Sequence, residues 1–342
     1  MSEKFVFVVQ KETALNDFLR SELPKALDAG LAAESKSGLS NSKIRRLIFS
    51  QNVSVDAGGG FFVCKNPSFA LRKNARVQVL FDQEKFFFQK KNDDIEFELD
   101  GSRVLFEDDA IIVVNKPPHF PTEPTFVQDR DNLRSAVVRY LHKKIGLDKN
   151  PPYCGIVHRL DRDTSGVILF SKRRDCNAAL FKAFDSSGLE NDGGAASQER
   201  VAKKVYVALC ERGGSLGLAN DSAGKEFSVR NYLGRVSGKS QAAKWGSVPK
   251  EKGGKFARTD FKILKEKGGR CLIEARLLTG RTHQIRVHLS QSGLPILGDV
   301  LYGGRAAERI FLHAFALELP HPESGEPLRF EAPLPDEFYQ LR

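Results

Sequence analysis

Apolar and polar residues recur with two different periods along this chain, and the change of period predicts the order of its elements. Residues 5–9 (FVFVV) and 75–81 (ARVQVLF) have the composition of strands, and the second stretch alternates. Between them, Thr13 is a residue type favoured at helix N-caps. The helix predicted after it has four apolar residues on one face: Leu15, Phe18, Leu19 and Leu23.

A second helix and a strand are predicted in residues 42–56 (SKIRRLIFSQNVSVD), after a loop over residues 28–42. The spacing of Ile44, Leu47 and Ile48 turns these side chains inward. The basic residues of the same helix are then free to face solvent or phosphate: Lys43, Arg45 and Arg46.

The pattern changes in the second half of the chain. Residues 83–102 are charged and rich in Phe, which is typical of a connector with strand character. The run AIIVV (residues 110–114) predicts a buried strand that ends at two prolines, and VILF (residues 167–170) predicts another. Residues 131–146 predict a helix with four side chains on one face: Leu133, Val137, Tyr140 and Leu141. Gly, Ser, Asn and Asp are frequent in residues 185–200 and 211–226, which predicts surface loops.

The net charge of the chain predicts a class of binding partner. The chain has 342 residues and a net charge of +10, so we expect it to meet a polyanion, of which nucleic acid is the commonest. The alternative is that the charge serves only solubility. The five cysteines are scattered and no CxxC pair exists, which indicates reduced thiols. The N-terminus lacks the apolar region of a signal peptide and no window is long enough to span a membrane, so we expect a cytoplasmic protein without a membrane partner.

The stretch HRLDRDTSG, residues 158–166, contains the first candidate chemistry. Asp161 stands between Arg159 and Arg162, just before the predicted strand at residues 167–170. A carboxylate on a loop anchored at a sheet edge can act as a nucleophile or general base, and flanking arginines favour its charged form. The same residues can also form an ion pair with only a structural role.

Basic side chains cluster a second time in residues 274–299: Arg281, His283, Arg286 and His288. A metal site is an alternative for the histidines, but they lie five residues apart and no Glu stands between them as in a zinc-protease helix. Neither GxGxxG nor GxxxxGK[ST] occurs, so the sequence predicts no nucleotide cofactor.

Taken together, three stretches resemble the RluA/RluD-type pseudouridine synthase family: HRLDRDTSG, KKVYVAL (residues 203–209) and LLTGRTHQIRVHLSQSGLPILGDVLYG. The early NKPP and the late FLHAFALELPHP match as well, so the resemblance covers residues 103–335. It implies an α+β pseudouridine synthase fold, with a central mixed, largely antiparallel sheet and an active-site cleft. The implied reaction isomerises uridine in RNA, loses no atoms and needs no metal or organic cofactor.

The resemblance also assigns roles to single residues. Asp161 matches the catalytic aspartate, which attacks the sugar of the target uridine or promotes a glycal intermediate. Arg159 matches the arginine that enters the RNA helix when the base flips out. Tyr206 matches the tyrosine that packs on the base, although by itself it also suits a core position in a strand. Arg281 matches the basic partner of the aspartate. The loop around it is completed by Thr279, Gly280, His283 and Gln284.

Residues 12–82 resemble the alpha-L RNA-binding module of ribosomal small-subunit protein four, through LNDFLRSELP, SKIRRLI, NVSVD and ARVQV in that order. The resemblance implies a small α/β RNA-binding domain over residues 1–82, a connector over 83–102 and a catalytic domain over 103–342. Within the small domain, the RNA contacts would come from Lys43, Arg45 and Arg46.

These features predict a monomeric RNA pseudouridine synthase whose partner is ribosomal RNA of the large subunit, with transfer RNA as the alternative substrate. A non-catalytic RNA-binding or ribosome-assembly factor on the same fold is a second hypothesis, which an intact Asp161, Tyr206 and Arg281 disfavour. A third is an Asp-dependent hydrolase of nucleosides or sugars, but a second carboxylate at a recognisable spacing is missing.

Overall fold

The computed structural model of the chain describes residues 2–28, 44–45, 47–48, 52–82, 94–124, 130–185, 202–212, 223–238 and 243–339. These residues fall into two compact units. The smaller unit comprises Met1–Asp93 with Thr125–Arg130, and the larger comprises Asp94–Pro124 with Asp131–Arg342. No helix in the described ranges combines the length and the apolarity that crossing a lipid bilayer requires.

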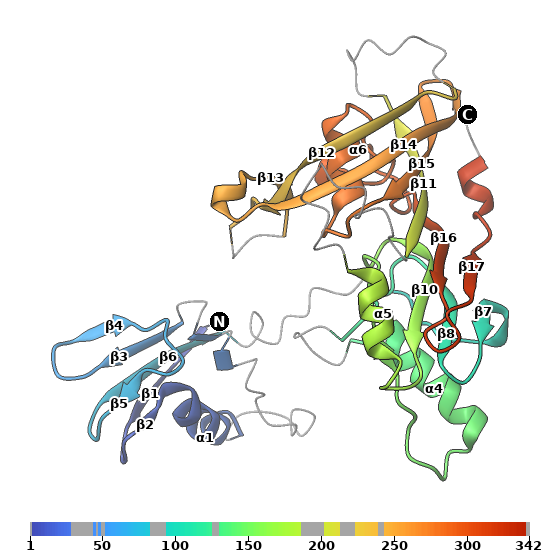
Figure 1. The fold of residues 1–342 in the computed structure, drawn as a ribbon. Coiled ribbons are helices and arrows are strands. Elements are labelled where there is room, and N and C mark those ends of the chain that lie inside the picture. The colour runs from blue at the N-terminus through green and yellow to red at the C-terminus, as the bar shows by residue number, and fades with distance from the viewer. Residues whose placement is uncertain are drawn as a thin grey trace. The chain divides into compact units, whose positions relative to one another are not determined.

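The smaller unit packs a helix against a sheet of four antiparallel strands in the order β1-β6-β3-β4 (Figure 1). Its elements are β1 (Ser2–Val8), β2 (Thr13–Ala14), α1 (Leu15–Asp28), β3 (Val53–Asp56), β4 (Phe61–Val63), β5 (Ala70–Leu71) and β6 (Arg76–Asp82). The predicted strands at residues 5–9 and 75–81 are therefore confirmed, as is the predicted helix. The apolar face of that helix, together with Ile44, Leu47 and Ile48, is buried in the core of this unit.

The larger unit contains, within the described residues, an 11-stranded sheet with most of its strands in the order β13-β12-β14-β15-β11-β16-β10-β8-β7. Its neighbours are antiparallel except for the parallel pair β10 and β16, which confirms the mixed, largely antiparallel sheet. Its strands are β7 (Val104–Glu107), β8 (Ile111–Lys116), β9 (Gly155–Ile156), β10 (Ser165–Ser171), β11 (Lys203–Glu211), β12 (Glu226–Arg235), β13 (Trp245–Ser247), β14 (Lys255–Lys267), β15 (Arg270–Leu277), β16 (Leu312–Pro320) and β17 (Pro327–Glu331).

Helices of the larger unit cover both faces of this sheet. Alternate residues of β8 and β10 point to opposite sides: Ile112 and Ile168 share a core with α4, whereas Ile111 and Val167 share another with α5. Burial on both faces explains why the runs AIIVV and VILF are apolar without alternation. The helices are α4 (Leu133–Ile145), α5 (Asn177–Phe184), α6 (Gln284–Gln291) and the 3₁₀ turns η2 (Gly101–Arg103), η5 (Lys250–Lys252), η6 (Val300–Tyr302) and η7 (Asp336–Tyr339).

Some predictions at element boundaries are wrong. Thr13 is not the N-cap, because it lies in β2, where it pairs with Leu71, and the helix begins at Leu15. Residues 94–100, predicted to have strand character, contain no strand; instead Phe97 and Leu99 pack in the core of the larger unit. The rest of the connector, residues 83–93, lies outside the described residues, as do 186–200 and 213–222 of the two predicted loops.

Candidate active site

The HRLDRDTSG stretch connects β9 to β10 and ends where three strands meet. Gly166, the second residue of β10, pairs with Lys116 of β8 on one side and with Ala314 of β16 on the other. Its φ is +111°, and a Cβ at this position would lie 2.1 Å from the carbonyl oxygen of Ala314. Only glycine fits here, and this close approach fixes the point at which the loop enters the sheet.

Lys116, the lysine of NKPP, supports the loop from inside the protein. Its side chain is fully buried, and its Nζ donates to the carbonyl oxygens of Pro117 at 2.9 Å, Arg162 at 2.8 Å and Thr164 at 2.8 Å. Burial lowers the pKa of Lys116 to about 7, against the opposite effect of Asp163 and Asp161. Two of the three carbonyl groups belong to the loop on the C-terminal side of Asp161, so this lysine holds the backbone that carries the carboxylate.

The carboxylate of Asp161 is 31% exposed and is approached by two basic side chains. Nη1 of Arg286 lies 3.4 Å from its Oδ2, and Nε2 of His283 lies 3.8 Å from the same oxygen. The prediction that Arg281 is the basic partner is wrong: its Nε donates to the carbonyl oxygen of Phe256 at 2.9 Å. The reason is that α6 begins at Gln284, which puts Arg286 in the first helical turn, beside Asp161.

Arg286 has a second, closer carboxylate partner. Its Nε and Nη2 donate to the two carboxylate oxygens of Asp299 at 2.7 and 2.8 Å, and its guanidinium carbon lies 5.0 Å from the ring centre of Tyr302. Burial lowers the pKa of Arg286, but the bonds to Asp299 and the charge of Asp161 outweigh burial and raise it. The guanidinium therefore stays charged, is oriented by Asp299, and turns its remaining nitrogen toward Asp161.

Tyr206 lies on β11 and is buried at 8% exposure. It pairs with Ala275 of β15 and Ala314 of β16, and the register with β16 shifts between Val205 and Tyr206. Such an irregularity re-aims a side chain. Burial raises the pKa of Tyr206, and the negative charge of Asp161 raises it further. The structure therefore brings the predicted tyrosine close to the predicted aspartate, with its phenol held in the neutral form.

The loop before α6 is organised by Gln284. The Oε1 of this side chain accepts bonds from the Thr279 hydroxyl at 2.7 Å and from the Arg281 backbone N–H at 3.0 Å, while its Nε2 donates to the Arg258 carbonyl at 2.9 Å. Thr279 and Gln284 are 1% and 3% exposed, so they shape the loop from within and do not face a ligand. Gly280 lies near Lys204, whose Nζ would be 3.5 Å from an added Cβ.

The two histidines of this segment occupy different environments. His283 has the left-handed φ of +56° that precedes α6, and its Nδ1 lies 2.8 Å from the Tyr302 hydroxyl. His288 is fully buried, with Nδ1 2.9 Å from the Thr259 hydroxyl and Nε2 2.9 Å from Oδ1 of Asn231. Burial lowers the pKa of His288 to about 4. Of the two, His283 is the one that faces the carboxylate of Asp161.

The remaining predicted residues lie away from Asp161 or outside the described ranges. The side chain of Arg159 is 57% exposed and forms an ion pair with Glu123. Arg45 is helical and exposed in the smaller unit, whereas Lys43 and Arg46 lie outside the described residues.

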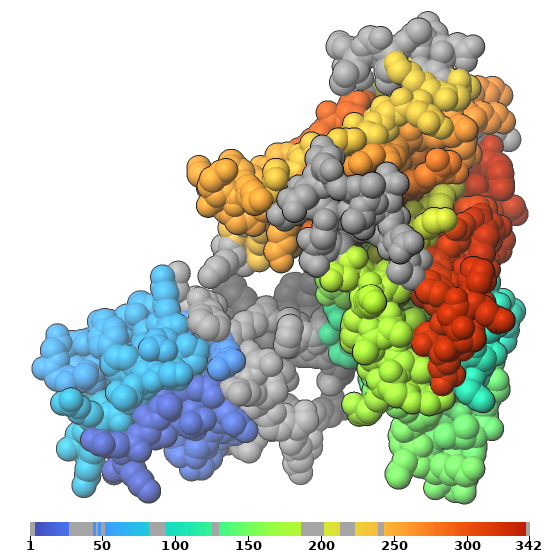
Figure 2. All heavy atoms as spheres, in the orientation of Figure 1, coloured from blue at the N-terminus to red at the C-terminus, as the bar shows by residue number. Residues whose placement is uncertain are grey.

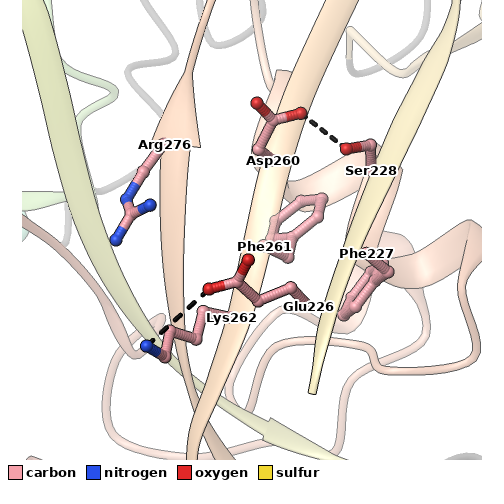
Figure 3. A pocket seen from close by; sticks show the side chains of 7 residues that line it. All are labelled: Glu226, Phe227, Ser228, Asp260, Phe261, Lys262 and Arg276. Atoms are coloured by element: carbon pink, nitrogen blue, oxygen red, sulfur yellow. Dashed lines mark hydrogen bonds and ion pairs between the residues drawn. The ribbon is translucent and has the colours of Figure 1, made fainter. Parts of the chain in front are cut away.

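A hollow of about 270 Å³ lies elsewhere on the sheet (Figure 3). The cross-strand row through Tyr206 continues over Ala275 to Phe261, so these side chains share one face. Asp260 and Arg276 both line the hollow and stand opposite each other in the register of β14 and β15. They alternate with that row and therefore lie on the opposite face. Its charged groups have local partners: the Ser228 hydroxyl donates to Asp260 at 2.7 Å, and Lys262 forms an ion pair with Glu226 at 3.7 Å. Five of its seven lining residues therefore lie on the face opposite Tyr206, Phe227 and Phe261 line it from the other face, and its lining includes none of the groups described around Asp161.

Three contributors were missed when the sequence was interpreted: the pairing of Arg286, its orientation by Asp299, and the support from Lys116. Each had a signal in the chain. Arg286 belongs to the basic cluster of residues 274–299, and Asp299 ends the stretch LPILGD. Lys116 is a charged residue that follows the apolar run 110–114 after one intervening Asn. A lysine in such a position needs internal acceptors, but the sequence does not show which carbonyl groups supply them.

Residues 110–291 match the model of the RNA pseudouridylate synthase family. The chain is 32% identical to an uncharacterised RNA pseudouridine synthase of Helicobacter pylori over 91% of its own length and 86% of the relative's. It is 28% identical to ribosomal large subunit pseudouridine synthase D of Vibrio vulnificus, over 98% and 95%. The solved structure of human RNA pseudouridylate synthase domain containing 4 has the same fold, with a TM-score of 0.52 at 21% identity, over 70% of this chain and 90% of that one. This chain therefore belongs to the RNA pseudouridylate synthase family.

Proposed function

We propose that this RNA pseudouridine synthase uses the carboxylate of Asp161 as its nucleophile and modifies large-subunit ribosomal RNA. The proposal that Asp161 is the nucleophile is supported by the environment of its carboxylate. Asp161 is partly exposed, on a loop held by Lys116, with Arg286 and His283 on one oxygen. Tyr206 is close enough for the charge of Asp161 to raise its pKa.

This arrangement suits an isomerisation. If the carboxylate attacks C1′ of the target ribose, the bond from C1′ to N1 breaks and its electron pair leaves with the uracil. After the ring turns, C5 bonds to C1′ and displaces the carboxylate; C5 then loses a proton and N1 gains one, so the formula is unchanged. If Asp161 instead removes the 2′ proton, the bond from C1′ to N1 breaks and a glycal forms; the uracil then re-adds to C1′ through C5 while Asp161 returns the proton to C2′, and C5 loses a proton as N1 gains one. Both routes need one carboxylate that is charged and reachable.

Arg286 favours the charged form of the Asp161 carboxylate without forming a tight ion pair with it. Its two shorter bonds go to Asp299, at 2.7 and 2.8 Å, and the contact with Asp161 is longer, at 3.4 Å. A tight bidentate pair with Asp161 would occupy both of its oxygens. The looser contact stabilises the negative charge and leaves a carboxylate oxygen for the substrate.

Tyr206 is suited to packing against the flipped base. A buried phenol with a raised pKa keeps its proton near neutral pH, which makes it a weak base. Its ring can stack on uracil, and its hydroxyl can pass a proton only if it gives one up at the same time. Unstacking the target costs a few kcal/mol, which stacking on a side chain partly offsets.

Arg159 is proposed as the side chain that takes the place of the extruded base. It extends into solvent two residues before Asp161, and its present partner is Glu123 on the surface. An exposed ion pair of this kind contributes about 0–1 kcal/mol, so RNA can displace Glu123 at little cost.

The basic residues outside the site support RNA as the substrate. The β13 arm, residues 243–256, stands out from the larger unit (Figure 2) and carries four exposed lysines against one acidic residue: Lys244, Lys250, Lys252 and Lys255 against Glu251. Aromatic side chains lie among them, as where Lys250 lies 5.9 Å from the ring centre of Tyr232. Cations with interleaved aromatics suit a polynucleotide. The exposed Arg45 adds a second basic site in the smaller unit, which we propose to be an alpha-L-type RNA-binding domain.

Ribosomal RNA of the large subunit is the proposed target because one relative that matches 98% of the chain, and others that match 70% of it, carry that substrate in their names. The enzyme would act as a monomer in the cytoplasm. This is the compartment in which bacteria, such as the source of the relative named above, make ribosomal RNA.

The deciding experiment maps pseudouridine across all RNA in cells that lack the gene and in cells complemented with wild type or Asp161→Asn. We expect sites in large-subunit RNA to disappear on deletion, return with wild type and stay absent with Asp161→Asn, while the purified variant binds the same RNA within about threefold. Sites confined to transfer RNA would overturn the substrate, and full modification by Asp161→Asn would overturn the nucleophile.

A further inference from the structure

Tyr302, in the 3₁₀ turn η6, connects the edge strand β13 to the candidate nucleophile through one histidine. We propose that Tyr302 is a positioning residue that holds His283 in the tautomer whose Nε2–H points at Asp161. The inference rests on the proposed role of Asp161 and adds a group that acts on that carboxylate through another side chain.

The first step is the direction of the bonds at the Tyr302 hydroxyl. The backbone N–H of Trp245 donates to Oη at 2.9 Å, because an amide nitrogen can only donate. Tyr302 is 6% exposed, so its own proton needs an acceptor inside the protein. Within the described part of the chain, the acceptor in reach is Nδ1 of His283 at 2.8 Å. Nδ1 is then unprotonated, and a neutral His283 carries its proton on Nε2.

The second step is where Nε2 points. It lies 3.8 Å from Oδ2 of Asp161, the same oxygen that Nη1 of Arg286 approaches. The ring is well fixed, since it packs edge-on against Tyr302 with centroids 5.6 Å apart and planes at 87°. Its backbone has a left-handed φ of +56°, which is unfavourable for a residue with a side chain and is maintained by the surrounding contacts.

The third step is the charge of the ring. Burial lowers the pKa of His283; Asp161, Asp299 and Asp163 raise it, and Arg286 lowers it, with the balance below the ordinary value. The imidazole is therefore neutral at pH 7, and only a neutral ring has two tautomers. One presents an N–H to the carboxylate of Asp161, and the other presents a lone pair, which would repel it.

Tyr302 thus acts on Asp161 through His283, and its own side chain is buried, at 6% exposure. In the wild-type arrangement the nucleophile has one full positive charge, from Arg286, and one neutral N–H dipole, from His283. The dipole stabilises the carboxylate without forming a second ion pair.

The first test removes only the hydroxyl. Tyr302→Phe keeps the ring that lies 5.0 Å from the Arg286 guanidinium and leaves the tautomer of His283 unspecified. We expect kcat to fall about tenfold with KM within about twofold, because one ordinary hydrogen bond is lost and substrate contacts remain. The acidic limb of the pH profile of kcat should move to higher pH. The control is Tyr140→Phe, which removes a hydroxyl on α4 and should leave both constants within about twofold of wild type.

The second test reads the tautomer directly and does not depend on activity. Long-range ¹H–¹⁵N correlation spectra of histidine-labelled wild type at pH 8, with His283 assigned by comparison with His283→Gln, should show Nε2 protonated. In Tyr302→Phe the signals of His283 should move toward a mixture of tautomers. In the His283→Gln background, adding Tyr302→Phe should change kcat by less than about twofold, because no tautomer remains to be set.

The outcomes separate this inference from the proposed function. A wild-type His283 protonated on Nδ1 would overturn the inference, as would a Tyr302→Phe enzyme with the wild-type tautomer and pH profile. In either case, an inactive Asp161→Asn would still leave the nucleophile in place. An active Asp161→Asn would overturn the nucleophile itself.

Discussion

The guanidinium of Arg286, and not that of Arg281, faces the carboxylate of Asp161, with Nη1 3.4 Å from Oδ2. Both arginines belong to the same basic cluster, five residues apart. Arg281 precedes α6 and bonds to the Phe256 carbonyl, whereas Arg286 lies within the helix and is oriented by Asp299. Substituting each arginine in turn tests which of the two acts on Asp161.

Arg286→Lys should lower kcat about 100-fold, equivalent to about 2.7 kcal/mol, because a lysine cannot hold Asp299 bidentately and also reach Asp161. Arg281→Met should lower kcat less than about tenfold, since its side-chain bond is to a backbone carbonyl. Single-turnover conversion of a labelled RNA substrate measures both. A larger loss for Arg281→Met than for Arg286→Lys would contradict the assignment.

Lys116 predicts a pH dependence of stability with a definite sign. Its pKa falls from 10.5 in the unfolded chain to about 7 in the folded protein, so between these values the unfolded state binds more protons. The cost of burying the ammonium is fully present below about pH 7 and is relieved as the pH rises. Relative to Lys116→Met, the wild type should therefore gain up to about 1.4 kcal/mol of unfolding free energy per pH unit above pH 7. Urea denaturation of both proteins at pH 7, 8 and 9 measures the difference, and a constant difference would show that Lys116 does not titrate there.

Gly166→Ala should destabilise the larger unit by more than about 2 kcal/mol, because the added Cβ would meet the backbone of the neighbouring strand at a positive φ. Gly101 is a matched control, since an added Cβ there meets nothing within 4 Å. Gly101→Ala should stay within about 0.5 kcal/mol of wild type. Thermal unfolding of the three proteins provides the comparison, and equal stability of the two variants would argue against a crowded loop entry.

Replacing Lys43, Arg45 and Arg46 together with Ala should weaken RNA binding and flatten its salt dependence. Each lost phosphate contact lowers the slope of log K against log salt by about 0.7–0.9. Binding titrations with a ribosomal RNA fragment at several salt concentrations give the slope. A slope equal to that of the wild type would mean that this helix does not contact phosphate.

Much of this protein could be predicted from local patterns. The buried strands at residues 110–114 and 167–170 and the helix around Val137 follow from spacing along the chain, because an element that must bury one or both faces shows this in its own residues. The motif around Asp161 also identified the reaction family before any contact was known.

Only the tertiary structure decided which groups act on Asp161. Arg286 reaches it across 125 positions of sequence, and Lys116 reaches the carbonyl groups of its loop across 46 and 48. These pairings depend on how the strands align and how α6 is rotated. The spacing of apolar residues specifies which face of an element is buried. It does not specify which of several charged residues in a motif contacts a given partner, because that contact is set by tertiary packing.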